Sequence, residues 1–267
     1  MVVNFFIFII IMNIKKVLIF ILIILLVFKL FDYIKTYRNK KINKEFHKEF
    51  NEKFNNDFIS VNTNEPLYEI YNNYIPKHIS EQLYLYIKNH PKNNKNNLSN
   101  SFKGSYGLSF SFKNNNIYKN LKKNNIEQLY EIINKLIHNT TNDSNAYYFN
   151  ILIIPTKKEN KKMAADFHYD NTLSIEKNNK DILPKFVTVL YLHLPNEFNN
   201  GHLIIKNNNE DIKIKPEVSK LIKFRGDTYH GVENMSSNNN DFRVSLVLEH
   251  YKLSNDDLKL VPEFIIH

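Results

Sequence analysis

Residues 185–215, KFVTVLYLHLPNEFNNGHLIIKNNNEDIKIK, contain three short runs of branched and aromatic residues separated by turn-forming segments. Runs of this length, bounded by Pro, Asn and Gly, are typical of β-strands joined by tight turns. The pattern continues on both sides of this stretch, and the full set of expected strands is 147–154, 185–194, 202–206, 211–215, 220–224 and 242–251. Many short strands with close turns predict an antiparallel sandwich or jelly roll.

Two segments upstream of these strands have the periodicity of helices. Residues 79–89 and 126–139 are the expected helices, and the second places Ile126, Leu129 and Ile133 on one face. A stripe of this kind is typical of a helix that lies against a flat sheet. We therefore expect a mainly β domain over residues 66–267, with a jelly-roll core (147–251) buttressed by the preceding helices.

The amino terminus is strongly apolar. The run VLIFILIILLVF (17–28) continues to Ile34, and a bilayer span needs about 20 residues, so 17–34 is long enough if Lys29 reaches the headgroups. No small-residue cleavage site follows, which favours a retained single-pass transmembrane helix (anchor 1–35) over a removed signal peptide. Residues 36–65 are expected to form a stalk. Basic residues after the span outnumber those before it, which favours a cytosolic domain, but the side of the membrane stays open.

Charge and cysteine content exclude several classes of function. The net charge of +9 comes from lysines scattered over the whole chain, without a dense basic tract, so no nucleic-acid partner is expected. The chain has no cysteine, which excludes disulfides, thiolate metal sites and cysteine nucleophiles. The oligomeric state is not indicated by any of these features.

The stretch DFHYDNT (166–172) places His168 and Asp170 two residues apart in an extended segment. Side chains at i and i+2 on a strand share a face, so these two can bind one metal ion. His230, in FRGDTYHGVEN (224–234), supplies a third candidate ligand. Two imidazoles and one carboxylate are the ligand set of non-haem Fe(II) oxygenases. The competing interpretation is that these are polar residues of loops, and His193 and His202 are rival ligands.

Arg243 and Ser245 have the same i, i+2 spacing on the last expected strand. A guanidinium offers a planar fork for a carboxylate, and a hydroxyl adds one more donor. A dicarboxylate that binds a metal ion at one end needs such a clamp at its other end.

Taken in order, these blocks resemble the iron- and 2-oxoglutarate-dependent dioxygenases, closest to the prolyl 4-hydroxylase-like branch. The resemblance spans 147–251 and rests on DFHYDNT, VTVLYLHL with Tyr191, EFNNGHLII, LIKFRGDTYHGVEN and DFRVSLVLEHY. It implies a double-stranded β-helix in which His168, Asp170 and His230 bind Fe(II) at the catalytic centre. Arg243 and Ser245 would bind the distal carboxylate of 2-oxoglutarate. Tyr191 either contacts this cosubstrate or fills the barrel.

The implied activity is hydroxylation of an unactivated C–H bond, with O2 as oxidant and decarboxylation of 2-oxoglutarate to succinate. Ascorbate is an optional reductant in such reactions, and the expected substrate is a peptidyl proline or lysine. Two alternatives stay open. One is a catalytically silent β-helix module that binds a partner at a membrane, and the other is a different metal enzyme on a cupin-like barrel.

Overall fold

The structure is a computed structural model of the 267-residue chain. It describes residues 28–30, 33, 66–93, 105–113, 116–138, 143–156, 163–177, 180–206, 211–239 and 241–267. The chain divides into two units, Met1–Glu52 and Lys53–His267.

In the first unit the described residues, 28–30 and 33, are helical, and the side chains of Phe28, Leu30 and Tyr33 are exposed. The rest of the predicted membrane anchor (1–35) and the whole predicted stalk (36–65) lie outside the described residues. Among the residues that are described, no helix combines the length and the apolar composition needed to cross a bilayer.

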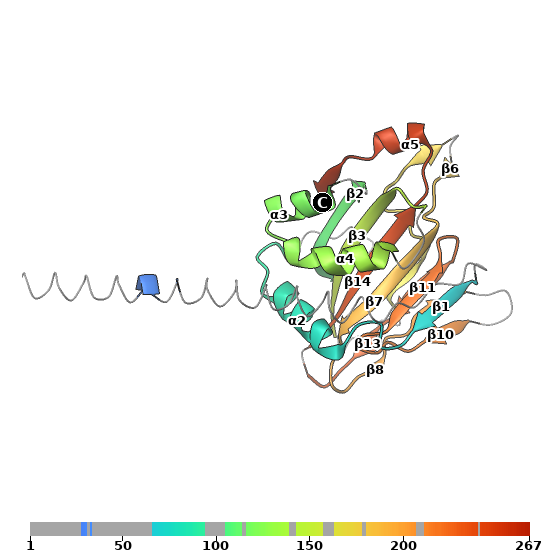
Figure 1. Ribbon diagram of the computed structural model, residues 1–267. Helices are drawn as coiled ribbons and strands as arrows, with labels where there is room; N and C mark the ends of the chain where they lie inside the picture. Colours follow the sequence, from blue (N-terminus) through green and yellow to red (C-terminus); the bar gives the residue numbers. More distant parts are fainter. Residues whose placement is uncertain are drawn as a thin grey trace, which may run out of the picture. The chain divides into compact units, whose positions relative to one another are not determined.

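The second unit is mainly β, and its largest element is a seven-stranded antiparallel sheet (Figure 1). In spatial order its strands are β1 (Tyr68–Tyr71), β11 (Leu221–Arg225), β7 (Phe186–His193), β14 (Phe242–Tyr251), β3 (Ala146–Pro155), β2 (Tyr106–Lys113) and β15 (Phe264–Ile266). Because β1, β2 and β15 come from outside 147–251, this sheet extends beyond the predicted core.

A smaller antiparallel sheet faces the large one. In spatial order its four strands are β10 (Ile212–Ile214), β9 (Leu203–Ile205), β12 (His230–Glu233) and β4 (Met163–His168). Two short antiparallel pairs complete the β structure: β5 (Glu176–Lys177) with β6 (Lys180–Asp181), and β8 (Asn199–Asn200) with β13 (Met235–Ser236). Two antiparallel sheets in this arrangement agree with the predicted jelly roll.

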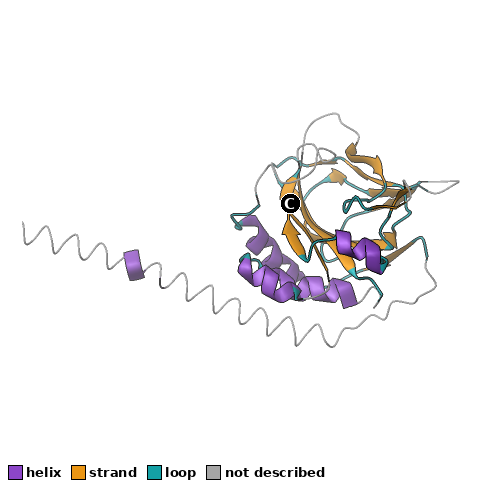
Figure 2. Cartoon of the chain, turned by 90° about the horizontal axis from the view of Figure 1, so that it is seen from above, coloured by secondary structure: helices purple, strands orange, loops and turns teal. Residues whose placement is uncertain are grey.

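The central strands β3, β7 and β14 read as almost continuous apolar runs, and nearly all of their side chains are buried. Continuous burial, in place of alternation, is expected where both faces of a strand are covered. One face looks into the space between the sheets, where Val187, Leu203 and Phe224 belong to a shared apolar cluster. The other face is covered by helices (Figure 2).

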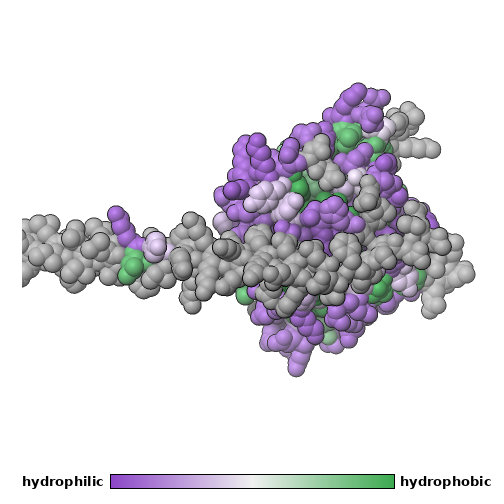
Figure 3. Space-filling view, viewed as in Figure 1, coloured by the Kyte–Doolittle hydropathy of each residue, from purple (hydrophilic) through white to green (hydrophobic). Residues whose placement is uncertain are grey.

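The helices are α2 (Lys77–Lys88), α3 (Ile117–Lys123), the 3-10 turn η2 (Glu127–Leu129), α4 (Tyr130–His138) and α5 (Asn255–Leu260). α2 contacts β7 and corresponds to the predicted helix 79–89. The single helix predicted over 126–139 is wrong in its first turn. Asn125 has a φ of +59° and the Ile126 amide donates to the Leu121 carbonyl, so the chain leaves α3 in a tight turn before α4 begins. In the view of Figure 3 the described surface is mostly hydrophilic.

Candidate metal centre

The two candidate histidine ligands lie on adjacent strands of the small sheet. His168 is the last residue of β4 and His230 is the first residue of β12, and the two are register partners. Cross-strand partners place their side chains side by side. The imidazole centroids are 4.5 Å apart.

Asp170 lies two residues after His168, where β4 has ended, and its carboxylate faces both rings. Its Oδ1 is 3.4 Å from Nε2 of His168, and its Oδ2 is 3.4 Å from Nε2 of His230. One ligand atom of each of the three residues lies within 4.8 Å of the other two. Within the described ranges this is the one group of three His or acidic side chains close enough to hold a metal ion.

Hydrogen bonds to the backbone fix which nitrogen of each ring faces the centre. Nδ1 of His168 lies 2.7 Å from the Asp166 carbonyl oxygen, and Nδ1 of His230 lies 3.0 Å from that of Thr228. A carbonyl oxygen can only accept, so each Nδ1 carries the proton and each Nε2 presents a lone pair. A hydrogen bond from the ring nitrogen that does not bind the metal is the usual way in which proteins orient a metal-binding histidine.

Burial sets the electrostatics of the centre. His230 and Asp170 are 5% and 9% exposed, and His168 is half-buried. Burial, helped by the neighbouring His168, lowers the pKa of His230 against the opposing charge of Asp170, which favours its neutral form. Burial raises the pKa of Asp170, but the neighbouring His230 and His168 outweigh it and lower this pKa overall. Burial lowers the pKa of His168, but the adjacent Asp170 outweighs it and raises this pKa overall. The result is two imidazoles and an ionised carboxylate in one pocket.

The donor set fits a divalent metal ion such as Fe(II). Oδ2 of Asp170 is buried and accepts no hydrogen bond from the described residues, which is costly for a carboxylate unless a further group binds it. Neutral imidazole nitrogens and a carboxylate oxygen suit first-row metals, and three protein ligands leave coordination positions for other molecules. The three predicted ligands are therefore brought together.

Arg243, on β14, lies in the same cavity. It is 2% exposed and its Nη1 donates to the Gly201 carbonyl at 3.2 Å, where a φ of +81° favours glycine. Its guanidinium carbon is 5.4 Å from the centroid of the Tyr191 ring. Its Nε has no hydrogen-bond partner, and no carboxylate of the described chain pairs with it. A buried cation in this state is suited to an anion from outside the protein.

Ser245 and Tyr191 lie next to this cation. Ser245 is two residues after Arg243 on β14 and is the register partner of Tyr191 on β7. The Ser245 hydroxyl is buried without a hydrogen-bond partner among the described residues. Tyr191 contributes to the cavity wall, and Ser245 is not among the residues that line it. Burial raises the pKa of Tyr191 against the opposing charge of Arg243, which keeps the phenol protonated. Their roles toward a cosubstrate stay predictions.

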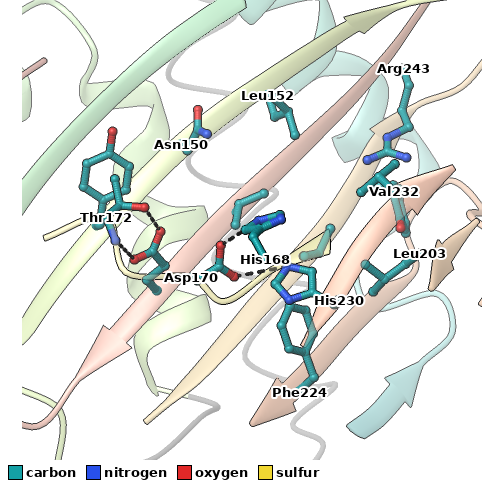
Figure 4. A pocket seen from close by; sticks show the side chains of 15 residues that line it. Asn150, Leu152, His168, Asp170, Thr172, Leu203, Phe224, His230, Val232 and Arg243 are labelled. Atoms are coloured by element: carbon teal, nitrogen blue, oxygen red, sulfur yellow. Dashed lines mark hydrogen bonds and ion pairs between the residues drawn. The ribbon is translucent and has the colours of Figure 1, made fainter. Parts of the chain in front are cut away.

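One cavity connects all these groups (Figure 4). Its volume is about 60 Å³, several times the roughly 10–15 Å³ that one water molecule needs. Both sheets line it, and Figure 4 shows the His168–Asp170–His230 group between Arg243 on one side and Thr172 on the other. Its apolar wall consists of Leu152, Val189, Leu203, Phe224, Val232 and Val247.

Three further polar residues of this wall, Tyr148, Asn150 and Glu249, were missed at the level of sequence. Successive side chains of a strand point to opposite faces, so Glu249, six residues after Arg243, lies on the same face of β14 as Arg243. This spacing is visible in the sequence as R-x-S-x-V-x-E (243–249). It identifies Glu249 as an inward-facing residue once the strand is known.

The two rival histidines take no part in the centre. His193 lies 3.2 Å from Asp241 and stacks on Tyr84 with ring centroids 3.9 Å apart. His202 lies 2.6 Å from Glu233 through its Nδ1. Both pairs are partly exposed and lie outside the cavity wall. They are best explained as local structural contacts.

Comparison with known proteins gives structural neighbours only. No family model matches the chain, and no curated protein sequence matches it. A Pseudomonas putida prolyl-4-hydroxylase aligns with a TM-score of 0.45 and 12% identity over 70% of this chain and 94% of its own. A viral collagen prolyl hydroxylase from Paramecium bursaria chlorella virus-1 aligns with a TM-score of 0.43 and 14% identity, over 69% of this chain and 96% of its own. A Burkholderia pseudomallei oxidoreductase of the 2OG-Fe(II) oxygenase family aligns with a TM-score of 0.44 and 11% identity, over 70% of this chain and 85% of its own. These are the enzyme classes that the motifs resemble.

Proposed function

We propose that this protein is an Fe(II)- and 2-oxoglutarate-dependent dioxygenase that hydroxylates an unactivated C–H bond. The observation that carries the proposal is the joint placement of two features in one cavity. His168, Asp170 and His230 converge there with their ligand atoms within 4.8 Å of one another. The buried guanidinium of Arg243, which has no acidic partner among the described residues, lines the same cavity.

Each side chain has a separate task in this reaction. His168, Asp170 and His230 would hold Fe(II), which when bound supplies the activation of O2 coupled to decarboxylation of 2-oxoglutarate to succinate and CO2. The backbone acceptors Asp166 and Thr228 keep both imidazoles in the tautomer that binds. A fixed orientation of this kind preserves the open face of the centre.

Arg243 would select the cosubstrate. A guanidinium binds a carboxylate through two parallel hydrogen bonds, and these are stronger in a buried site than in water. Gly201 occupies one of its N–H groups, which leaves Nε and further N–H groups for a ligand. The apolar walls formed by Leu152, Leu203 and Val232 exclude water from the space between this clamp and the metal ligands.

The test is metal and cosubstrate binding by the purified protein. We expect one Fe(II) per chain, tight binding of 2-oxoglutarate only when metal is present, and slow succinate formation in the presence of O2 and ascorbate. His230→Ala should lose the iron, whereas His193→Ala should retain it. Wild-type protein that binds neither iron nor 2-oxoglutarate, or His230→Ala protein that keeps iron at unit stoichiometry, would overturn the proposal.

The substrate, the setting of the enzyme and the reductant are finer parts of the same proposal. We propose a peptidyl proline or lysine as the oxidised residue, a membrane location through residues 1–35, and ascorbate as the reductant that restores Fe(II). A Trichoplax adhaerens prolyl hydroxylase aligns with a TM-score of 0.41 and 17% identity, over 84% of this chain and 96% of its own. Its structure was determined in complex with a peptide fragment of the hypoxia inducible factor oxygen degradation domain. The retention of all three metal ligands together with Arg243 argues against a catalytically silent module.

A further inference from the structure

The cavity has opposite charges at its two ends. Arg243 and Glu249 point inward from the same face of β14, and six residues of strand separate their Cα atoms by roughly 20 Å. The metal ligands lie between them, because Figure 4 shows His168 and Asp170 between Arg243 and Thr172, and Thr172 bonds to Glu249. The Arg243 end is taken by the cosubstrate in the function proposed above. The Glu249 end therefore faces the substrate.

Glu249 forms no ion pair with the described residues, although its charge contributes to raising the pKa of His168. It is 3% exposed, and no Lys, Arg or His of the described chain forms an ion pair with it. Burial raises its pKa to about 8, with a smaller contribution from the charge of Asp170. A carboxyl group in this environment stays protonated until a cation arrives, and a cation then strengthens its interaction with the site.

Three donors already converge on this carboxyl group. The Thr172 amide donates to Oε2 at 3.1 Å, the Thr172 hydroxyl bonds Oε1, and the Tyr251 hydroxyl donates to Oε2. Such donors favour the ionised form, so they oppose the effect of burial. The group is therefore held in place and needs only a positive charge in the cavity to ionise.

A polar side chain next to Glu249 has an acceptor atom without a hydrogen-bond partner among the described residues. Asn150 lies on β3, opposite Val247 and diagonal to Glu249, and lines the cavity. It is 8% exposed and its Oδ1 makes no hydrogen bond with the described residues. Two buried acceptors, Glu249 and Asn150, thus face the same space. Their natural ligand is a compact donor with positive charge.

The charge balance of the loaded site points the same way. Fe(II) and Arg243 contribute three positive charges, while Asp170 and 2-oxoglutarate contribute three negative ones, so these groups cancel. Glu249 adds no charge to this balance while it stays protonated. When a substrate with one positive charge arrives, Glu249 can give up its proton, and the ionised carboxylate then balances the added charge.

We propose that Glu249 and Asn150 select a cationic aliphatic side chain, that of a peptidyl lysine, as the substrate of this site. The ammonium group would bind Glu249 and Asn150, and its methylene groups would lie along Val247 toward the metal ligands. This inference rests on the proposed dioxygenase function and narrows its substrate class. Proline, which carries no charge, would leave Glu249 without a counter-ion and Asn150 Oδ1 without a donor.

The test compares three peptides that differ at one central residue: lysine, norleucine, which has the same four side-chain carbons but no ammonium group, and proline. Binding is measured without O2 on the full chain loaded with Fe(II) and 2-oxoglutarate, and oxygen gain is then measured by mass spectrometry. We expect the lysine peptide to bind at least about tenfold tighter than the norleucine peptide and to gain one oxygen atom. Equal binding of the three peptides, or oxidation of the proline peptide alone, would overturn the inference.

Variants assign the preference to the two acceptors. Glu249→Gln should reduce the preference for lysine over norleucine by about tenfold or more, with iron stoichiometry and 2-oxoglutarate affinity as evidence of an intact centre. Asn150→Leu should also reduce the preference for lysine over norleucine, and it provides the test if Glu249→Gln does not fold. Glu197→Gln, which neutralises an exposed carboxylate, is the matched control and should keep the wild-type preference for lysine. A preference that survives both cavity variants would contradict the proposal. Wild-type protein that binds no iron or no 2-oxoglutarate would instead reject the proposed function.

Discussion

At the scale of single residues, the cavity holds two buried ionisable side chains that form no ion pair with the described residues, Arg243, which is charged, and Glu249, which burial keeps protonated. Transfer of a charge from water to a protein interior costs several kcal/mol, and only a partner of opposite charge offsets that cost. In the unliganded protein this cost is met by the packing of the rest of the domain. Residues kept for function at the expense of stability are typical of active sites.

The first prediction concerns the cost of burying Arg243. Arg243→Met should raise the free energy of unfolding of the metal-free protein by about 1 to 4 kcal/mol, because an unpaired buried cation is replaced by an apolar chain. It should also weaken 2-oxoglutarate binding at least about 30-fold, since the clamp is lost. Urea denaturation and calorimetry measure the two effects. Arg225→Met, at an exposed arginine paired with Asp227, is the control and should change neither. A less stable Arg243→Met protein would contradict the argument.

The second prediction concerns pH. Glu249 has a pKa of about 8 in the folded protein, against an ordinary value of 4.5. Between these values the folded state binds one proton more than the unfolded state, so its stability falls as the pH rises through this window. Glu249→Gln removes that dependence. The stability of the variant relative to wild type should therefore increase from pH 5 to pH 8, by on the order of 2–4 kcal/mol.

This difference is measured by urea denaturation of both metal-free proteins at each pH. His250 is fully buried and its pKa lies well below its ordinary value, so its contribution to stability rises with pH up to about 6.5. Because both proteins contain His250, its effect cancels in the comparison. A stability difference that does not depend on pH would show that Glu249 is already ionised in the fold.

The candidate metal ligands could be predicted from the sequence, but the Glu249 end of the cavity could not. His168 and Asp170 are close in sequence, and His230 stands in a recognisable sequence context. Glu249 carries no such signal: its proposed role depends on its burial and on its lack of an ion pair with the described residues. Both are properties of the folded structure, because they depend on which strands lie next to β14.

At the scale of elements, the strands of the core were predicted better than the elements at its edges. β3, β7 and β14 are long apolar runs, and local pattern alone identifies them. β1 and β15 have four and three residues, and they become strands through pairing with β11 and β2. Pairing between distant segments is not encoded in a local pattern, so such strands escape sequence analysis.

The close approach of two elements at Gly226 gives the third prediction. A Cβ atom added there would lie 1.6 Å from the carbonyl oxygen of Pro184, which belongs to the backbone and cannot rotate away. Gly226→Ala should therefore shift the end of β11 and cost about 2–3 kcal/mol of unfolding free energy in urea denaturation. Gly231→Ala is the comparison, because the nearest atom there is the flexible tip of Met163, at 2.8 Å. An equal or greater loss at Gly231 would refute this account.

At the scale of the whole molecule, every group of the proposed site belongs to the second unit, Lys53–His267. The proposed anchor belongs to the first. The chemistry of the site needs only side chains of the second unit, whereas attachment to a membrane needs only the apolar run at 17–34. The two properties should therefore be separable by cutting the chain.

The last prediction follows from this separation. A chain that begins at Lys53 should bind iron and 2-oxoglutarate as the full chain does, but it should leave the membrane fraction of cells that produce it. As a control of unchanged length, Ile24→Lys with Leu25→Lys places two charges near the middle of the apolar run, each costing about 2.5–3.5 kcal/mol for insertion. Like the shortened chain, this variant should be released from the membrane fraction when membranes are washed with alkaline carbonate. Persistent membrane association of the chain from Lys53 would locate the attachment in the second unit, and a shortened chain that fails to bind iron would show that the first unit supports the site.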